Sequence, residues 1–579
     1  MFVRVKSTPN SPRSSVQIVE TRRVDGKVIQ SVVRYVGVAA NEGELVELKR
    51  LAESIRLRME VERSEQIPLF APEELARPSG HKTRSARLPK PLADVRLSDV
   101  REETRVVEGI HDVFAPLWKE LGFTRILENA SQANILQDCV LARIAQPTSK
   151  HRTAALLEKQ FGVSIPLDRI YRMMDALHGK AELAQNLVFE ATTSLFPGQV
   201  DVLFFDVTTL YFESVEEGDL RQFGYSKDQQ FQSTQVVLAL ATTQNGLPVG
   251  YKVFPGSTGE VKTLLACVNA WRARLDIGRI VLVADRAMMS EDNLAALEAA
   301  KIEYIVGAKL KQLPKAQKLQ VLEVGTFDAA TFDDDPIRLK EFEFTPGRRI
   351  IVSHSERRAA KDRSDRERMV AKVQKRLAGK ARKAKKAEDT ETTPKPSKAV
   401  KQLVGNRGYA RFLKLEGETT VTLNEDKIAQ EAHWDGLHGL ITNSQSLTAT
   451  EVLARYRQLW TIEAAFRVQK HDLAMRPIYH WKPKRIEAHI LICYLAYALL
   501  RHAQYRVSLQ QEPVSVEQLR NELLAVQASI LVDQTTRARY RLPSPMTQRA
   551  KAIYQTFNLK RTQVPTPLIP DPKPAGKKV

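Results

Sequence analysis

The stretch Asp201–Val207, DVLFFDV, decides the fold of this chain. A short continuous apolar run of this kind is typical of a strand that is buried on both faces of a sheet. An unpaired carboxylate beside such a run is costly to bury, so Asp206 near its end requires a partner. Capping a turn or pairing with a nearby base is the ordinary role of a strand-end aspartate, and Asp206 alone does not exclude it.

The pattern that follows Asp206 alternates strands and helices. Residues 235–243 and 247–254 flank Asn245-Gly246, which is a strong hairpin signal. The remaining predicted elements are a helix at 259–275, a buried strand at 279–284 (RIVLVA), a helix at 290–300 and a strand at 303–308. This order predicts a mixed sheet with helices on its faces. Asp206 lies on the first strand, and Asp285 lies just past the fourth.

A third carboxylate lies in Tyr456–Lys470, YRQLWTIEAAFRVQK. If this stretch is one helix, five side chains share one face, because three- and four-residue spacing returns to the same side of a helix. These residues are Tyr456, Trp460, Glu463, Arg467 and Lys470. An amphipathic core helix with a solvated polar face is the plainer alternative. We favour the functional interpretation because two other carboxylates, Asp206 and Asp285, each end an apolar run.

Three carboxylates on rigid elements are suited to hold hard divalent cations such as Mg²⁺. Two such ions about 3.5–4 Å apart can stabilise the entering and leaving oxygens of a phosphoryl displacement. We expect Asp206 to bridge the two ions, with Asp285 serving one of them and Glu463 the other. Other carboxylates lie close to Asp206 in a loop-like stretch and are interpreted as surface charge, namely Glu213, Glu216, Glu217 and Asp219.

Composition indicates a basic protein with a polyanionic partner. The chain has 579 residues and a net charge of +20, which favours nucleic acid before a membrane surface, although an ordinary basic enzyme is the alternative. Cys139, Cys267 and Cys493 form no C-x-x-C pair, which is consistent with a reducing cytoplasm. The longest apolar run, Ile490–Leu500, is too short to cross a bilayer and predicts a buried helix, so we expect no membrane role.

The flanking regions predict further units, several of them basic. Lys150, Arg152, Arg169 and Arg172 lie at helix starts or on polar faces, where DNA contact and plain helical packing are both open. Ala371–Lys386 contains eight Lys or Arg and no acid, which suits a DNA-backbone clamp or a solvated helix. The predicted units are an N-terminal β-hairpin plus helix module (1–65), a linker (66–97), a helical DNA-binding domain (98–195), the first part of the core (196–310), a β-rich insertion (311–445), the second part of the core (446–535) and a C-terminal extension with a disordered tail (536–579).

Three segments of the sequence resemble the catalytic segments of Asp–Asp–Glu (DDE) insertion-sequence transposases. They are FFDVTTLYFE, VLVADRAMM and YRQLWTIEAAFRVQK, and RIAQPTSK and DGLHGLITN extend the similarity. The branch it resembles has the signature Y-x2-R-x3-E-x6-K and a β-strand insertion before the Glu. The gap of 178 residues between Asp285 and Glu463 (463 − 285) is long enough for that insertion.

The resemblance implies a mixed α/β fold. It would have a ribonuclease-H-like core interrupted by a β-rich insertion, with an N-terminal β-hairpin module and a helical DNA-binding domain. It also implies that Asp206, Asp285 and Glu463 bind two Mg²⁺ ions, for which Mn²⁺ can substitute.

The resemblance further implies contacts to DNA. Tyr456 and Lys470 would contact transposon-end phosphates, and Trp460 would stack on a displaced base. The signature Arg falls at Leu459, which leaves Arg457 and Arg467 as the nearest bases. Trp434 in the insertion is a second candidate for base stacking.

The predicted function is a transposase that cuts the ends of an insertion sequence and joins the freed 3′-hydroxyl to target DNA. Its partners would be double-stranded DNA, both transposon end repeats and target, and its own copies in a homodimer or larger synaptic complex. The predicted location is the cytoplasm, in association with the nucleoid. A ribonuclease-H-like nuclease or resolvase without strand transfer and a non-catalytic DNA-binding protein are the alternatives.

Overall fold

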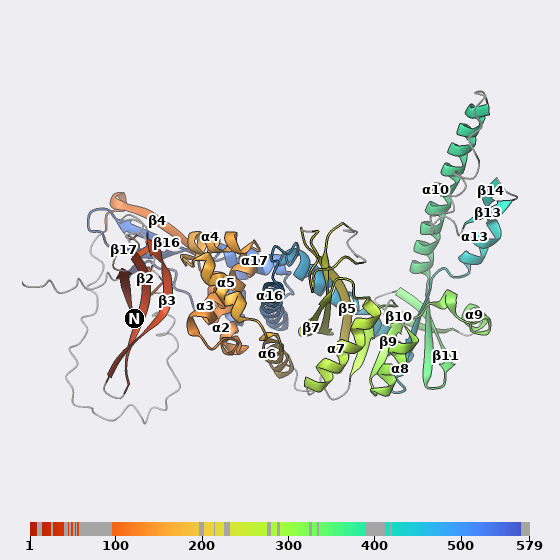
Figure 1. Cartoon of the computed structure of the whole chain (residues 1–579), viewed down its shortest axis with the longest axis horizontal. Coiled ribbons are helices and arrows are strands. Elements are labelled where there is room, and N and C mark those ends of the chain that lie inside the picture. The colour runs from red at the N-terminus through yellow and green to blue at the C-terminus, as the bar shows by residue number, and fades with distance from the viewer. Residues whose placement is uncertain are drawn as a thin grey trace, which may run out of the picture.

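The chain forms an elongated molecule with its N-terminal strands near one end and the long helix α10 at the other (Figure 1). The computed structural model describes residues 1–7, 14–24, 27–39, 45, 48, 49, 52, 53, 55, 56, 95–195, 202–213, 215–224, 232–274, 280–286, 290–323, 327–332, 335–388, 412–416 and 420–568. Within these ranges the fold is a mixed α/β fold, as the sequence predicts.

The core sheet is built around β5 (Val202–Tyr211). β5, β6 (Gln235–Thr243) and β7 (Pro248–Pro255) form an antiparallel meander, and Gly246 takes a φ of +71° in the turn between β6 and β7. β8 (Val281–Ala284) and β9 (Glu303–Gly307) continue the sheet on the other side of β5, each running parallel to its inner neighbour. This order is the ribonuclease-H-like topology, and that prediction is confirmed.

Both faces of this part of the sheet are covered. Side chains alternate along β5, so that Phe205 packs with Trp271 of α7 (Glu260–Arg274), while Phe204 faces the opposite core. α8 (Glu291–Ala299) lies beside α7 and packs on β9. The second face is covered in part by α15 (Trp460–Arg467), which packs on β5 and β6. Burial on both faces explains the continuous apolar runs in these strands.

The insertion extends the same sheet. β15 (Leu437–Thr442) pairs antiparallel with β9, and β12 (Arg348–Ser355), β11 (Asp335–Thr345) and β10 (Asp328–Phe332) follow outward. The result is one nine-stranded sheet, ordered β10-β11-β12-β15-β9-β8-β5-β6-β7. The strands of the insertion are therefore joined to the core by backbone hydrogen bonds.

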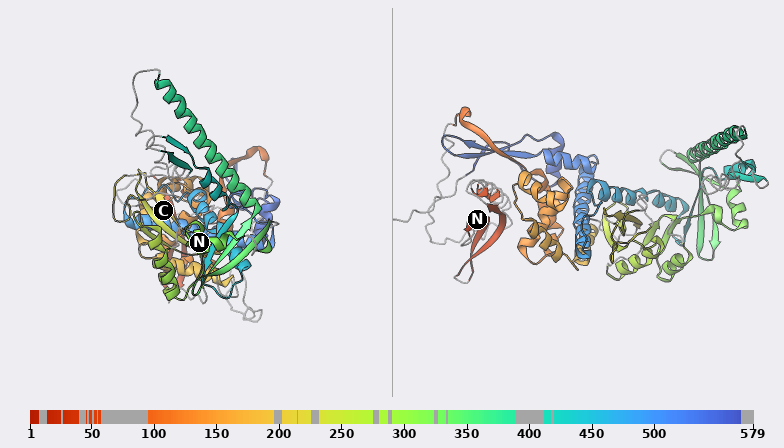
Figure 2. Two further views of the ribbon diagram at one scale, coloured as in Figure 1. Left: turned by 90° about the vertical axis from the view of Figure 1, so that its right-hand side faces the viewer. Right: turned by 45° about the horizontal axis from the view of Figure 1, so that its top comes forward.

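The helices and the small hairpin of the insertion lie around its outer end. α10 (Glu356–Glu388) projects from the body, as two views show (Figures 1 and 2). The other elements are η5 (Leu310–Gln312), α9 (Lys315–Leu322), β13 (Leu413–Glu416), β14 (Thr420–Leu423) and α13 (Glu425–Ala432). The base of α10 is tied to the start of β15, since Arg366 pairs with Asp435 and Asp362 accepts from the amide of Gly436 at 3.1 Å.

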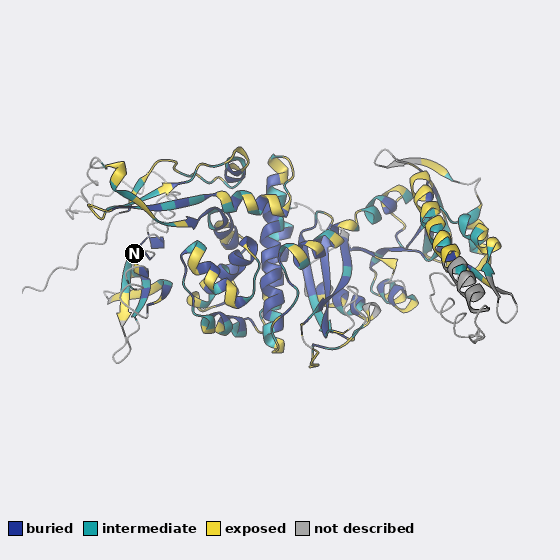
Figure 3. Cartoon of the chain, turned by 90° about the horizontal axis from the view of Figure 1, so that it is seen from above, coloured by how far each residue is buried: buried dark blue, intermediate teal, exposed yellow. Residues whose placement is uncertain are grey.

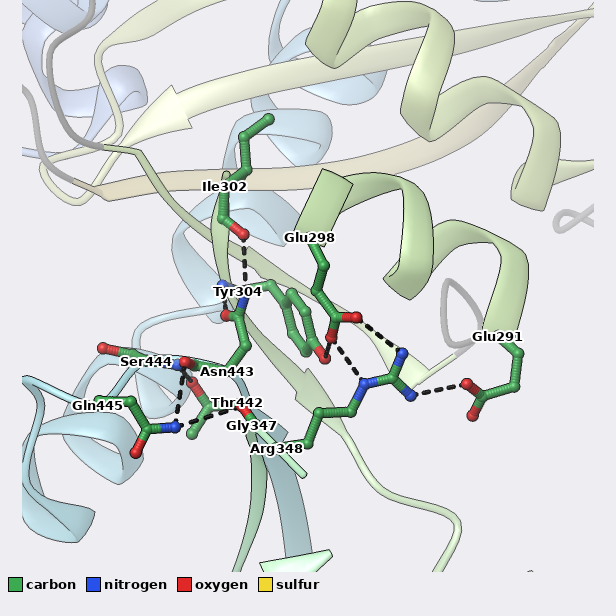
Figure 4. Close-up of polar contacts among 10 residues, drawn as sticks. All are labelled: Glu291, Glu298, Ile302, Tyr304, Gly347, Arg348, Thr442, Asn443, Ser444 and Gln445. Atoms are coloured by element: carbon green, nitrogen blue, oxygen red, sulfur yellow. Dashed lines mark hydrogen bonds and ion pairs between the residues drawn. The ribbon is translucent and has the colours of Figure 1, made fainter. Parts of the chain in front are cut away.

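Polar side chains fasten the insertion to the core (Figure 4). Asn443, just past β15, accepts from the amide of Tyr304 at 2.8 Å and donates to the carbonyl of Ile302 at 3.0 Å. Arg348, at the start of β12, binds Glu298 through two nitrogens, at 2.7 and 3.1 Å, and Glu291 at 2.7 Å. Both glutamates belong to α8, so these contacts cross from the insertion to the core.

Helices form the centre of the molecule. They are α2 (Gly109–Glu120), η3 (Phe123–Arg125), α3 (Ala130–Ala145), α4 (Lys150–Phe161), α5 (Leu167–Ala176) and α6 (Ala181–Ser194). α16 (Pro483–Gln510) packs against α2, α3, α5, α6 and β7, and is buried along most of its length (Figure 3). A helix that carries apolar side chains on every face is expected to be buried. The predicted buried helix at Ile490–Leu500 is thus confirmed.

Two small sheets lie near the N-terminal end. β1 (Phe2–Ser7), β2 (Ser14–Val24) and β3 (Lys27–Ala39) form a three-stranded sheet, so a third strand joins the predicted hairpin. β4 (Val100–Val107), preceded by η2 (Leu97–Asp99), pairs with β16 (Gln527–Asp533) in a sheet that also holds β17 (Arg539–Pro543) and β18 (Thr566–Leu568). α17 (Val516–Ala525) and α18 (Gln548–Thr556) complete this region.

The remaining predictions concern the linker, the C-terminal tail, membrane spans and the cysteines. Most of the predicted linker (66–94) and the end of the tail (569–579) lie outside the described residues, and the domain boundaries stay a prediction. Among the described helices, none has the length and apolar character needed to cross a membrane. All three cysteines are buried and carry free thiols.

Candidate active site

Asp206 and Asp285 lie at adjacent positions on neighbouring parallel strands. The register of β5 and β8 pairs Phe205 with Ala284, and each aspartate is the next residue along its strand. Parallel neighbours are about 4.8 Å apart, so the two aspartates leave the sheet side by side on the same face. Phe204 marks that face as the one covered by α15. The sheet alone thus brings together two residues that are 79 positions apart (285 − 206).

Backbone amides orient both aspartates. The amide of Val207 donates to Asp206 Oδ1 at 2.7 Å, and the amide of Arg286 donates to Asp285 Oδ1 at 2.6 Å. Asp285 is exposed, and Asp206 is half-buried. Each carboxylate is therefore fixed through one oxygen by the residue that follows it.

Glu463 approaches the same face from α15. Ile462, Ala465 and Phe466 anchor this helix in the core, which leaves Glu463 exposed in its first turn. The side chain of Tyr456 lies within electrostatic range of both Glu463 and Asp285. Burial raises the pKa of Tyr456 to about 12, and the Asp285 and Glu463 carboxylates act in the same direction, while Arg286 and Arg358 oppose them.

The donor set of Asp206, Asp285 and Glu463 fits a hard divalent cation, because it consists of carboxylates on a strand, a strand end and a helix. Within the described part of the chain, however, no three acidic, His or Cys side chains are close enough together to hold a metal ion. The structure pairs the two aspartates by register and places Glu463 on the adjoining helix, and it does not gather all three around one point.

The prediction of one continuous helix at 456–470 is wrong. α14 (Ala449–Arg457) ends before Gln458, α15 begins at Trp460, and a π-helix, η7 (Val468–Asp472), follows. The amides of Leu459 and Ile462 donate to the carbonyls three residues back, at 3.0 and 3.1 Å, which tightens the chain into a turn.

This break changes which signature residues lie together. Tyr456 belongs to α14, whereas Trp460, Glu463 and Arg467 belong to α15, so the five side chains do not share the face of one helix. Leu459 stands where the signature has Arg, and it packs partly buried against the main core. An arginine there could keep part of that contact with its methylene stem only by extending its guanidinium to the surface.

The other predicted DNA-binding residues differ in exposure. Trp460 is 64% exposed, which is unusual for a tryptophan, and Arg467 is exposed. Arg457, in the last turn of α14, and Lys470, in η7, are half-buried. Trp434 of the insertion is half-buried against the core cluster between the sheet and α7.

Three residues near Tyr456, namely Arg286, Arg358 and His438, are not among the predicted site residues. The ring of His438 in β15 lies 5.3 Å from the ring of Tyr456. Burial lowers the pKa of His438 to about 4, with contributions from Arg358, Arg286 and Arg457, so this histidine is neutral at neutral pH. Arg286 was within reach of sequence analysis, since it directly follows Asp285. Arg358 and His438 come from the insertion and could be found only from its topology.

The chain is similar to known proteins at the level of a family and of a solved structure. The family model described as "Transposase DDE domain" matches residues 197–499, which is more than half of the chain. Among solved structures, the chain is similar to the cryo-EM structure of a piggyBac transposase synaptic complex with hairpin DNA, at 11% sequence identity and a TM-score of 0.34, over 72% of this chain and 77% of that chain. No curated protein matches the sequence.

The match to the DDE domain begins just before β5 and ends within α16, so it contains Asp206, Asp285, Glu463 and the insertion between them. Transposases of this family generally use divalent metal ions and act on DNA. The chain therefore belongs to the DDE transposase family.

Proposed function

We propose that this transposase binds the ends of an insertion sequence, cuts the DNA there and joins the freed 3′-hydroxyl to target DNA. The observation that carries the proposal is the register of β5 and β8, which sets Asp206 beside Asp285 on the face covered by α15. In-line phosphoryl transfer depends almost entirely on positioning and on charge stabilisation, and both require carboxylates on rigid elements.

Asp206, Asp285 and Glu463 would hold the divalent ions, which we propose to be two Mg²⁺. Bound there, the ions would lower the pKa of the attacking water or hydroxyl and neutralise charge on the phosphate. The protein's own contribution is to hold the three carboxylates. Val207 and Arg286 fix the aspartates through their amides, and the buried side of α15 fixes the backbone of Glu463.

DNA binding is proposed for the residues around α15. Tyr456, Arg457, Arg467 and Lys470 would contact backbone phosphates. Trp460 would stack on a base, because a flat, 64% exposed indole beside a nuclease centre is suited to that role. Trp460→Ala should weaken binding of an unpaired end by about 1–3 kcal/mol while Trp460→Phe retains much of it, as measured with fluorescent end DNA.

The whole reaction requires two ends to be held together, so we propose a homodimer or larger complex on DNA. The net charge of +20 favours such an assembly on a polyanion. The Y-x2-R-x3-E-x6-K branch is proposed as well, since the chain retains Tyr456, Glu463 and Lys470 of that signature. A nucleoid-associated, cytoplasmic location follows from a DNA substrate and stays part of this proposal.

The test is isosteric neutralisation of each carboxylate. Asp206→Asn, Asp285→Asn and Glu463→Gln should each lower the cleavage rate by roughly 10³-fold or more, since a charged group that stabilises the transition state is lost. End binding, measured by gel shift, should remain. Glu213→Gln is the matched control, because Glu213 is exposed near the end of β5 and lies outside the proposed site.

Cleavage at the normal rate by any of the three variants would refute the assignment. A second assay supplies pre-cut ends with free 3′-hydroxyls and plasmid target. Joined products separate a transposase from a nuclease or resolvase on the same fold, since only the transposase transfers strands.

A further inference from the structure

The inserted strands place basic residues on the same edge of the sheet as the carboxylates. β15 runs antiparallel to both β9 and β12, so the start of β15 meets the carboxyl ends of its two neighbours. Leu440 pairs with Gly307, and the amide of Ala308 donates to the carbonyl of Gly439 at 2.8 Å. His438 therefore lies just beyond the end of β9, on the edge where Asp285 ends β8.

Arg358 reaches this edge from the insertion's long helix. α10 begins directly after β12, and Arg358 lies in its first turn, where its amide approaches the hydroxyl of Ser355 at 3.4 Å. Ligands of open α/β sheets bind beyond the carboxyl ends of the strands. Across this edge the groups thus change from carboxylates over β5 and β8 to basic side chains over β15 and β12.

Tyr456 marks where these groups meet. Its ring packs on that of His438, with centroids 5.3 Å apart. Its hydroxyl lies over Gly307, because a Cβ at that glycine would be 2.8 Å from the hydroxyl oxygen and 3.2 Å from the Cβ of Arg286. Tyr456 is therefore surrounded by Gly307 of β9, Arg286 just past β8 and His438 of β15.

The charges around Tyr456 are mostly positive on the side of the insertion. Arg286 and Arg358 both act on Tyr456 and His438 through space. The Arg358 guanidinium has a weak ion pair, with Nε 3.9 Å from Asp362 Oδ2, and its side chain is 50% exposed. Arg286 is exposed too. Two accessible guanidinium groups beside a neutral imidazole form a suitable site for an anion.

We propose that Arg286, Arg358 and His438 form a phosphate subsite for the DNA strand that lies on Asp206 and Asp285. The subsite binds a backbone phosphate near the one that reacts, and it aligns the strand across the carboxylates. The insertion thus supplies substrate contacts to the site as well as extra sheet. The subsite rests on the proposed function, since its ligand is the DNA to be cut.

The experiment measures which phosphates the protein senses. The full chain with Asp206→Asn, which binds without cutting, is titrated with a duplex carrying the inverted repeat of its own element. Each phosphate near the cleavage position is replaced in turn by an uncharged methylphosphonate. At the position held by the subsite the replacement should weaken binding roughly tenfold, the effect of losing a charge-assisted hydrogen bond.

Adding Arg358→Ala should make binding insensitive to the replacement at that one position and leave the other positions unchanged. Arg286→Gln should remove the sensitivity at the same position. Arg357→Ala is the control, because Arg357 is an exposed arginine in the same turn, and it should preserve the whole pattern. Thermal melting confirms that the variants fold.

An unchanged pattern in Arg358→Ala, or the same loss in Arg357→Ala, overturns the subsite. Failure of the proposed function appears separately: the Asp206→Asn parent would cut DNA at the normal rate, or it would show no preference for the repeat. Either result refutes the transposase site whatever Arg358 does.

Discussion

The nine-stranded sheet is buried differently at its core strands and at the outer strand β11 of the insertion. In the core half every residue of β6 is buried, as is every residue of β8, because helices cover both faces. In the inserted half β11 alternates, with Ile337 and Leu339 buried and Arg338 and Glu341 exposed. The sheet thus combines strands that are largely enclosed on both faces, β12 and β15 of the insertion among them, with an outer strand, β11, that is open to solvent on one face.

The core and the insertion also contribute different groups to the site. An enclosed half is rigid, and rigid strands are what paired carboxylates require. An outer strand with one open face can carry exposed charged residues such as Arg338. The carboxylates Asp206 and Asp285 lie on the core half, and two residues of the proposed subsite, Arg358 and His438, belong to the insertion.

Matched leucine truncations test the comparison most strongly. Leu240→Ala in β6 should lower the free energy of unfolding by about 4 kcal/mol, since the surrounding side chains cannot close the cavity. Leu339→Ala in β11 should cost about 2 kcal/mol, because a strand covered on one face can relax. Both leucines are buried, at 0% and 5% exposure. Urea denaturation measures both, and equal losses would contradict the distinction.

The same difference decided how much of the fold could be predicted. Runs such as VLFF and VLVA made β5 and β8 visible in the sequence, and the hairpin signal at Asn245-Gly246 joined β6 to β7. The order of strands and helices along the chain followed from local patterns, whereas a core that sets Asp206 beside Asp285 was implied by the resemblance to transposases. The strands were predicted correctly because a strand buried on both faces is a continuous apolar run, which can be recognised without knowing its partner strand.

What could not be predicted depends on long-range pairing. β4 and β16 form one sheet although more than 400 residues separate Val107 from Gln527 (527 − 107 = 420). The break between α14 and α15 leaves no mark in the sequence, because helical periodicity continues through it. Arg358 and His438 approach Tyr456 only because β15 lies between β9 and β12.

The contact between the halves can be weakened at Arg348. Arg348→Met keeps an unbranched apolar stem and removes the bonds of Arg348 to Glu298 and Glu291, shown in Figure 4. The expected loss is about 2 kcal/mol, because the bonds to Glu298 are charge-assisted and Glu291 is largely exposed. Glu341→Gln is the control, since its bond to Arg349 at 3.1 Å stays within the insertion. If Glu341→Gln lowered the free energy of unfolding as much as Arg348→Met, the contacts of Arg348 between the insertion and the core would have no special role in stability.

The Arg348 contact also predicts a pH dependence. The Arg348 hydrogen bonds, aided by one from Tyr304, lower the pKa of Glu298 below its ordinary value of 4.5. Because the folded-state pKa is the lower one, the stabilisation is complete above the unfolded value and is lost as the pH falls through the folded value. The stability difference between wild type and Arg348→Met should therefore shrink below about pH 4.5. A difference that stays constant from pH 7 to pH 3 would contradict it.

The smallest expected effect is at the boundary of the two halves, at Gly307 in β9. A Cβ there would be 2.8 Å from the hydroxyl oxygen of Tyr456, so Gly307→Ala should cost about 1 kcal/mol through overpacking. Gly259→Ala is the control, since a Cβ at Gly259 meets no atom within 4 Å. Tyr456→Phe removes the clashing oxygen, so Gly307→Ala should have almost no effect in that background. The two changes form a double-mutant cycle measured by thermal unfolding. The cost of Gly307→Ala could instead be the same in the wild type and in the Tyr456→Phe background. The strain would then lie in the backbone of β9, and the position of the Tyr456 hydroxyl would not require a glycine at 307.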